Sequence, residues 1–166
     1  MTTETVTDPR VQRLLDIEAL KTLKATYWRC WDTKDFEGWL SLFTDEATLL
    51  VDMSVRPDPG GMVQMLVEGK QRLRETVCVN NRYTVTVHQG HAPEFEFLSD
   101  TEARGIWPME DIVEREALTL FGRGHYRETY RKIDGEWKFT SIHLTRLRYS
   151  VIAAREDPSL FYPGQP

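Results

Sequence analysis

The hydrophobic pattern changes its period once along the chain, near residue 80, and this change restricts the folds that the chain can adopt. Within residues 11–31, apolar residues recur at steps of three or four: Leu20, Leu23, Tyr27, Cys30 and Trp31. This spacing is typical of an amphipathic helix. Residues 82–152 instead carry runs of β-branched and aromatic residues, which favour strands. Helices followed by a long run of strands predict an α+β fold, in which a curved sheet wraps around helices.

Three helices are expected before the strands. The first should end near Asp32, and Thr33 or Asp35 could cap a short second helix that follows almost at once. The second helix has its own apolar stripe: Phe36, Trp39, Leu40 and Phe43. The third is predicted over residues 69–79 (GKQRLRETVCV). The first two helices should therefore form a hairpin.

Six strands are expected, and most of them follow the third helix. They cover residues 47–52, 82–89, 94–99, 102–113, 117–133 and 136–152. Asp134-Gly135 between the last two is the signature of a type I′ hairpin turn. Residues 53–68, with two prolines and two adjacent glycines, are predicted to form a long loop. This loop could cover a pocket or contact another subunit.

Composition limits the partners that the chain can have. The 166 residues suit one domain, and 26 acidic against 21 basic residues give a net charge of −5 without long blocks of like charge. Nucleic acid and anionic membranes are therefore poor partners. We find neither an apolar run near the ~20 residues of a membrane span nor a signal-like leader, and expect a cytoplasmic protein. Cys30 and Cys78 lack CxxC spacing and are predicted to be buried free thiols.

The chain divides into three predicted parts. Residues 1–11 form a polar leader, residues 12–152 a single domain, and residues 153–166 a tail. The tail contains three prolines around Leu160, Phe161 and Tyr162, so we expect it to be extended and packed on a surface.

Two histidines stand three residues apart in TVTVHQGHAPEFEF, residues 84–97. An offset of three along a strand sends His88 and His91 to opposite faces, unless a bulge at Gly90 intervenes. No acid or cysteine at ligand spacing accompanies them, so we predict no metal site. His88 could instead be a base if a carboxylate fixed its ring, and Asp32 is a candidate partner. The polar face that His88 shares with two threonines could meet either solvent or a cavity.

Other chemistry has little support in the sequence. There is no Gly-rich phosphate loop, no GxSxG motif and no recognisable Cys-His motif. Nucleotide hydrolysis and serine hydrolase chemistry are therefore not expected, and we predict no cofactor.

Several segments together carry a resemblance to a known family. They are YWRCWDTKDFEGWLSLFTDEA, GKQRLRETV, TVHQGHAPEFEF, ARGIWPMEDIV and GRGHYRETYRKIDGEWKFTSIHLTRLR. Over roughly residues 12–150 the chain resembles the SnoaL-like family of the nuclear transport factor two-like, or scytalone dehydratase-like, superfamily. The resemblance implies a cone-shaped roll, with about three N-terminal helices in a highly curved mixed or antiparallel sheet around a pocket. Members include dehydratases, a dehydrochlorinase, ketosteroid isomerase, polyketide cyclases and proteins without known activity, so the fold alone names no reaction.

The resemblance also implies site residues. The family's catalytic His matches His88, and its partner Asp at the end of the first helix matches Asp32. A Tyr five residues before that Asp matches Tyr27, and an Arg in the last strand, which would bind substrate, matches Arg146. Tyr27 also lies on the apolar helix stripe and could be a core aromatic. Arg146 shares its strand parity with apolar residues, so an inward Arg146 needs a carboxylate or a ligand anion.

The implied activity is that of a cofactor-independent lyase or isomerase, dehydratase-like, acting on a hydrophobic cyclic, steroid-like or polyketide-like substrate. Two alternatives stay open: a non-catalytic ligand-binding or scaffold member, and a small subunit of a ring-hydroxylating oxygenase. His91, His125 and His143 are expected to be structural or rim residues, although one of them could reach the pocket. We expect a homotrimer or homodimer that associates through the outer face of the sheet.

Overall fold

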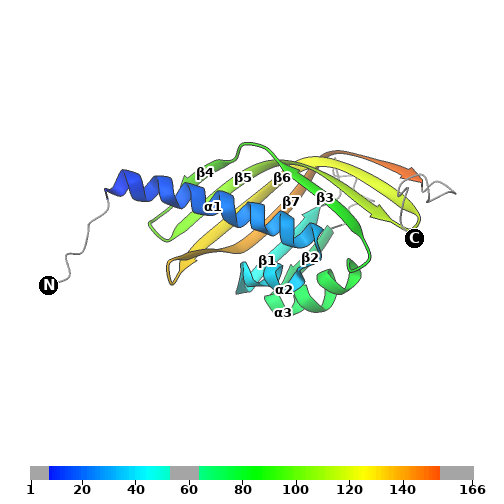
Figure 1. Cartoon of the computed structure of the whole chain (residues 1–166), viewed down its shortest axis with the longest axis horizontal. Coiled ribbons are helices and arrows are strands. Elements are labelled where there is room, and N and C mark those ends of the chain that lie inside the picture. The colour runs from blue at the N-terminus through cyan, green and yellow to red at the C-terminus, as the bar shows by residue number, and fades with distance from the viewer. Residues whose placement is uncertain (1–7, 53–63, 154–166) are drawn as a thin grey trace.

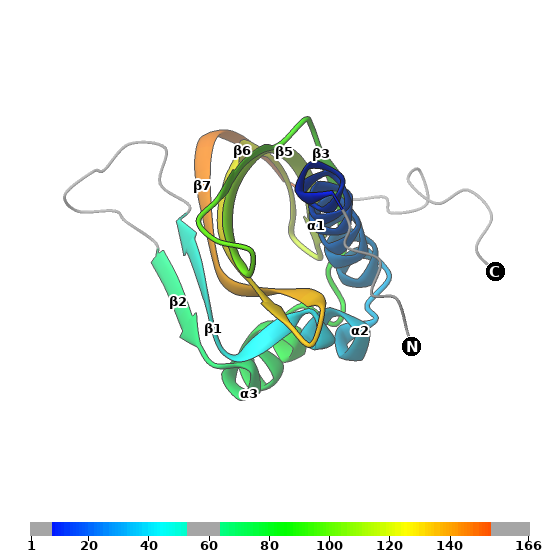
Figure 2. The same cartoon turned by 90° about the vertical axis from the view of Figure 1, so that its left-hand side faces the viewer.

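The computed structural model describes residues 8–52 and 64–153, which form an α+β fold (Figure 1). The helical segments are α1 (Pro9–Asp32), α2 (Phe36–Ser41), α3 (Lys70–Arg72) and η1 (Leu73–Cys78). The strands are β1 (Phe43–Asp52), β2 (Gln64–Glu68), β3 (Val85–Gly90), β4 (Glu94–Phe97), β5 (Glu102–Arg115), β6 (Leu118–Ile133) and β7 (Glu136–Ala153). The sheet has the strand order β2-β1-β7-β6-β5-β3, and β4 also pairs with β5. Figure 2 shows this sheet curling around an interior whose open side is covered by α1.

Helix α1 has the apolar stripe that the sequence predicts. All five stripe residues are at most 9% exposed. The helix begins at Pro9, inside the segment expected to be a polar leader, because the Asp8 side chain caps it by accepting a hydrogen bond from the Arg10 backbone. It ends at Asp32 as expected, and this places the Asp32 carboxylate against Thr86 and His88 of β3. Residues 1–7 lie outside the described residues.

A tight turn joins α1 to α2 and forms the predicted hairpin. Of the two expected caps, Asp35 is the one used, since its side chain accepts a hydrogen bond from the Gly38 backbone at 2.9 Å. Thr33 instead ends α1, where its backbone N–H donates to the Arg29 carbonyl. Trp39 of α2 is fully buried against the rings of the core.

The long strands β5, β6 and β7 form the predicted antiparallel meander. Asp134 and Gly135 both have positive φ, at 51° and 84°, as a type I′ turn requires. Strand β1 lies parallel to β7, a pairing that the local patterns did not predict. The sheet is therefore mixed, which is one of the two forms that the family resemblance implied. The inner face of the meander buries Tyr130, Phe139 and Ile142 under the helices.

Two elements differ from the prediction. Residues 64–68 of the expected loop form strand β2, which pairs antiparallel with β1 and buries Val67. The loop prediction rested on the prolines and glycines that precede these five residues in the sequence. The third helix is present, but after Arg72 it widens into the π-helical segment η1. The other loop residues, 53–63, and the tail residues 154–166 lie outside the described residues.

No helix among the described residues combines the length and the apolar character that a membrane crossing would need.

Candidate functional site

Strand β3 turns its polar face inward. Thr86 and Thr84, which comes just before the strand, are buried and the His88 side chain is 6% exposed, whereas Val85 and Val87 are 48% and 45% exposed. The polar face meets a cavity rather than solvent, because Thr86 and His88 line one. This is the reverse of the common pattern in one-sided sheets, where the apolar face is covered. The inversion identifies β3 as a candidate functional strand.

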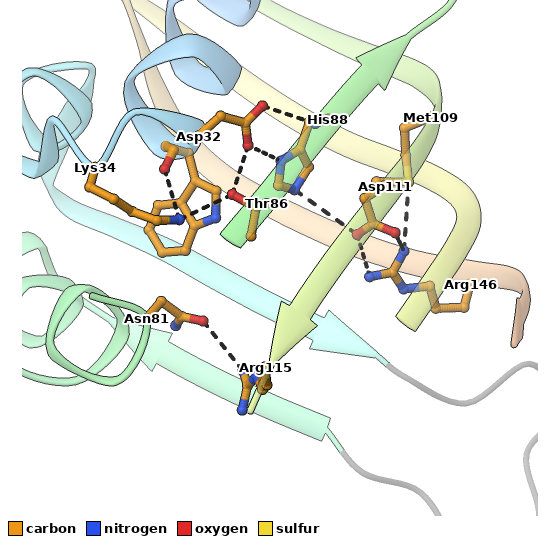
Figure 3. A network of polar contacts seen from close by, with 10 residues as sticks. Asp32, Lys34, Asn81, Thr86, His88, Met109, Asp111, Arg115 and Arg146 are labelled. Carbon is orange, nitrogen blue, oxygen red and sulfur yellow. Dashed lines mark hydrogen bonds and ion pairs between the residues drawn. The ribbon is translucent and has the colours of Figure 1, made fainter. Parts of the chain in front are cut away.

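Asp32, at the end of α1, holds the His88 ring (Figure 3). Its Oδ1 lies 2.7 Å from Nδ1 of His88, and its Oδ2 accepts a hydrogen bond from the His88 backbone at 2.9 Å. Burial acts to raise the pKa of Asp32, but the hydrogen bonds and charge of His88 outweigh it and hold this pKa below its usual value. An ionised carboxylate only accepts hydrogen bonds, so Nδ1 carries the proton and Nε2 is unprotonated in the neutral ring. The structure thus brings together the two residues that the sequence paired.

A second carboxylate lies near the other ring nitrogen. Asp111 pairs with His88 across β3 and β5, and its Oδ2 is 4.0 Å from Nε2 of His88. Arg146, on β7, donates to both oxygens of Asp111, at 2.6 and 2.7 Å. Asp111 and Arg146 are both at least 94% buried, so this is a charge-assisted bidentate pair inside the protein.

Gly122 of β6 makes room for the Asp111–Arg146 pair. A Cβ at this position would lie 2.1 Å from Nη1 of Arg146 and 2.1 Å from Oδ1 of Asp111. Any side chain there would displace the pair, so residue 122 must be glycine for Asp111 and Arg146 to keep this arrangement.

Arg146 faces inward, and the sequence required a carboxylate or a ligand anion for it there. Asp111 is that carboxylate, and sequence reasoning missed it. A signal was present, because Asp111 shares its strand parity with Trp107 and Met109, which are both buried. Since the charge of Arg146 is matched within the protein, an anionic group on a ligand is no longer needed to balance it.

Two tyrosines form part of the cavity wall. Tyr27 is 5% exposed and contacts the rings of Trp39 and Phe139, so it is a core aromatic and a cavity residue at once. Tyr126, which sequence reasoning missed, packs edge-on against Tyr27. Burial raises the pKa of both phenols well above the usual value, and the charge of Glu128 adds to this for Tyr27. Both hydroxyls therefore stay protonated and can donate hydrogen bonds.

A buried ion pair lies beside these tyrosines. Lys24 of α1 binds Glu128 of β6, and both side chains are fully buried. The Lys24 ammonium also lies 3.5 Å from the centroid of the Tyr126 ring and 4.2 Å from that of Tyr27. Burial lowers the pKa of Lys24 to about 8, although Glu128 opposes this. The ion pair and the contacts of Lys24 with both rings hold the two tyrosines in place.

The cavity has a volume of about 770 Å³ and walls that are mostly apolar. Polar groups come from α1, β3, β5, β6, β7 and the segment after η1. The lining residues are Tyr27, Trp31, Trp39, Leu49, Val51, Met65, Val77, Asn80, Asn81, Thr86, His88, Asp111, Val113, Arg115, Leu118, Leu120, Tyr126, Leu144 and Arg146. Arg115 is exposed and donates to the Asn81 side chain at 3.3 Å (Figure 3). Such a space suits an apolar molecule with a few oxygen atoms.

The remaining histidines do not line this cavity. His91 is exposed after the end of β3, and Gly90 keeps regular pairing with Met109 instead of forming a bulge. The reason for a glycine here is Trp28, whose indole would lie 1.7 Å from a Cβ at residue 90. His125 and His143 alternate with the buried Tyr126 and Leu144, on the outer face of the sheet. Within residues 8–52 and 64–153, no three His, Cys, Asp or Glu side chains gather as a metal site would require.

Comparison with solved structures gives proteins of the same fold. A candidate scytalone dehydratase from Novosphingobium aromaticivorans has a TM-score of 0.71 at 20% identity, covering 88% of this chain and 93% of that one. The hexachlorocyclohexane dehydrochlorinase LinA-type3 from Novosphingobium barchaimii has a TM-score of 0.68 at 18% identity, covering 86% and 94%. The β subunit of a candidate aromatic-ring-hydroxylating dioxygenase from N. aromaticivorans has a TM-score of 0.68 at 18% identity, covering 81% and 90%.

At these identities the likeness concerns the fold, which carries more than one kind of function among these proteins. The sequence itself matches a family model, described as the SnoaL-like domain, over residues 12–143. This match spans most of the 166 residues and contains Tyr27, Asp32 and His88. The chain therefore belongs to the SnoaL-like domain family.

Proposed function

We propose that this chain is a cofactor-independent lyase or isomerase, and that its reaction is the β-elimination of water from a hydroxy-ketone. The observation that carries the proposal is the His88 ring, held through Nδ1 by Asp32 beside an apolar cavity. This arrangement leaves Nε2 free to accept a proton. General-base catalysis by a positioned histidine contributes about 10²–10⁴-fold to a rate.

In the proposed reaction, Nε2 of His88 removes the proton next to the substrate carbonyl. The C–H electrons form a C=C bond, the C–O bond at the β carbon breaks, and the imidazolium returns its proton to the departing hydroxide, which leaves as water. Asp32 stabilises the imidazolium from the time it takes the proton until it returns it. Tyr27 donates a hydrogen bond to the carbonyl or to the departing hydroxyl, and Arg146 offers an N–H to a substrate oxygen.

The proposed substrate is hydrophobic and cyclic, steroid-like or polyketide-like. The cavity volume of about 770 Å³ and the apolar walls support this class. The internal pairing of Arg146 with Asp111 favours a neutral oxygen over an anionic group at that end of the substrate. An isomerase would use the same base but return the proton to another carbon.

A second candidate is a non-catalytic subunit of a ring-hydroxylating oxygenase. The likeness to the β subunit of a candidate dioxygenase favours it. Copurification with a large iron-sulfur subunit would support this alternative, and a protein that purifies alone with a ligand in its cavity would support the enzyme.

The test begins with mass spectrometry of molecules that copurify with the native protein. Hydroxy-ketones of the recovered class are then offered as substrates, and elimination gives a product lighter by one water, whereas isomerisation gives a product of equal mass. His88→Ala should abolish turnover, and His91→Ala, at the exposed histidine, should keep it. Equal turnover by the wild type and His88→Ala would overturn the proposal.

A further inference from the structure

Lys34 has an unusual backbone conformation in the turn between α1 and α2. Its φ of 63° lies in the left-handed region, which costs energy for any residue with a side chain and suits glycine or asparagine better. The turn holds it there, because its N–H donates to the Trp31 carbonyl and its carbonyl accepts from Phe36. A lysine at such a position raises the question of what its side chain does.

The Lys34 side chain reaches back into the site. Its Nζ donates to Oγ1 of Thr86 at 3.1 Å and to the Trp31 carbonyl at 3.2 Å. Thr86 in turn contacts Oδ1 of Asp32 at 2.8 Å, and the same Oδ1 contacts Nδ1 of His88 at 2.7 Å. Figure 3 shows these contacts as one continuous chain.

The chemistry of the ends fixes the direction of each hydrogen bond. An ammonium can only donate and an ionised carboxylate can only accept. The Thr86 hydroxyl must therefore accept from Lys34 and donate its own proton to Asp32. Lys34 thus orients Thr86 and brings a positive charge to the side of Asp32 away from His88.

We propose that Lys34 is a positioning residue that sets the base strength of His88 through Thr86 and Asp32. The inference rests on the proposed function, in which His88 is the base. The hydroxyl proton and the ammonium both withdraw negative charge from Oδ1 of Asp32. The carboxylate then stabilises the imidazolium less strongly than it would without Lys34. The ring would therefore give up its proton, and become able to act as a base, at a lower pH than in a protein that lacks this charge.

The other groups around His88 are already compensated. Asp111 of β5 is paired with Arg146 of β7, and the phenols of Tyr27 and Tyr126 are neutral. Lys34 is half-buried, so its charge is screened less than that of a surface lysine. Burial lowers the pKa of Lys34 and the charge of Asp32 opposes this, as expected for a cation held beside that carboxylate.

The test is the titration of the His88 ring in ligand-free protein, followed by NMR, with signals assigned from a His88→Gln variant. Lys34→Met should move the midpoint of the His88 titration upward by about half a pH unit, the order expected for one partly screened charge a few ångströms away. Asp32→Asn should move it in the opposite direction. Lys34→Arg keeps the charge and should restore a midpoint near that of the wild type. Lys21→Met, at an exposed lysine of α1, is the matched control and should leave it unchanged.

Lys34→Gly provides a second test that relieves the backbone strain. It should move the midpoint upward as Lys34→Met does, although it favours the turn. An unchanged midpoint in both variants, or a downward shift, would overturn the proposal and leave Lys34 as a turn residue. An upward shift in a protein that turns over no hydroxy-ketone would keep the electrostatic role of Lys34 and reject the proposed function.

Discussion

Asp111 and Arg146 depend on each other at the residue scale, because both are buried and their charges are matched in a bidentate pair. Removing one partner leaves an uncompensated buried charge. We therefore predict that Arg146→Met lowers the free energy of unfolding by about 3–5 kcal/mol. The double variant Asp111→Leu with Arg146→Met should recover most of this loss, because it removes both charges. Denaturant titration measures both.

The control is the exposed pair Arg104–Glu96, whose side chains are 59% and 57% exposed. Glu96→Gln should cost roughly 0.5 kcal/mol or less. If Arg146→Met were as mild as this control, Asp111 and Arg146 would have to be solvated, and the buried pair would be contradicted.

Not all site residues could be found from the sequence. The chemistry of the side chains and then the family resemblance indicated His88 and Asp32, and the resemblance alone indicated Tyr27 and Arg146. Each of the four lies in or beside the cavity. Asp111 was missed because strand alternation gives parity but not which face is inside. The Lys24–Glu128 pair was missed because its members lie 104 residues apart and charged residues are rarely fully buried.

At the element scale, Asp16 ties the first half of α1 to the β6–β7 hairpin. Its Oδ1 accepts hydrogen bonds from Lys132 at 2.5 Å and from the Trp137 indole at 3.1 Å. Burial acts to raise the pKa of Asp16, but these hydrogen bonds and the charge of Lys132 lower it overall. We predict that Asp16→Asn lowers the free energy of unfolding at pH 7 by about 1–3 kcal/mol.

The same contact predicts a pH dependence. Because the pKa of Asp16 is lower in the folded than in the unfolded chain, its contribution is complete above about pH 4 and is lost as the pH falls through the folded value. The free energy of unfolding of Asp16→Asn should therefore fall less steeply below pH 4 than that of the wild type. Asp100→Asn, at a fully exposed carboxylate, should follow the wild type. If the free energy of unfolding fell equally steeply with pH in Asp16→Asn and in the wild type, the contact of Asp16 with Lys132 and Trp137 would be contradicted.

Most elements followed from local patterns, and the exceptions have physical reasons. The α1 stripe and the Asp134-Gly135 turn depend on short-range spacing, which the sequence displays directly. Strand β2 and the parallel pairing of β1 with β7 depend on long-range partners that no local pattern contains. The widening of the third helix into η1 also has no local signal that we recognise.

At the scale of the whole molecule, an apolar row crosses the outer face of the sheet. Val87, Ile112 and Phe121 are paired side by side on β3, β5 and β6, and line a hollow of about 110 Å³. Val87 and Phe121 are 45% and 36% exposed. We predict that this row supports a homotrimer or homodimer, and that Phe121→Lys gives a monomer in sedimentation at micromolar concentration.

Arg131→Gln, an exposed change near the other end of β6, is the control and should leave the assembly intact. A wild-type protein that sediments as a monomer at this concentration would refute the prediction.

The curved sheet and the helices together place one histidine against one carboxylate, and the most direct test of the account is whether the two act as a unit. The measurement is a double-mutant cycle of turnover with His88→Ala, Asp32→Asn and the double variant, on the hydroxy-ketone that the protein converts. We predict that His88→Ala loses about 10²–10⁴-fold, that Asp32→Asn alone is also strongly impaired, and that the double variant is little worse than His88→Ala. Losses that multiply, as they do for independent residues, would contradict the His88–Asp32 dyad.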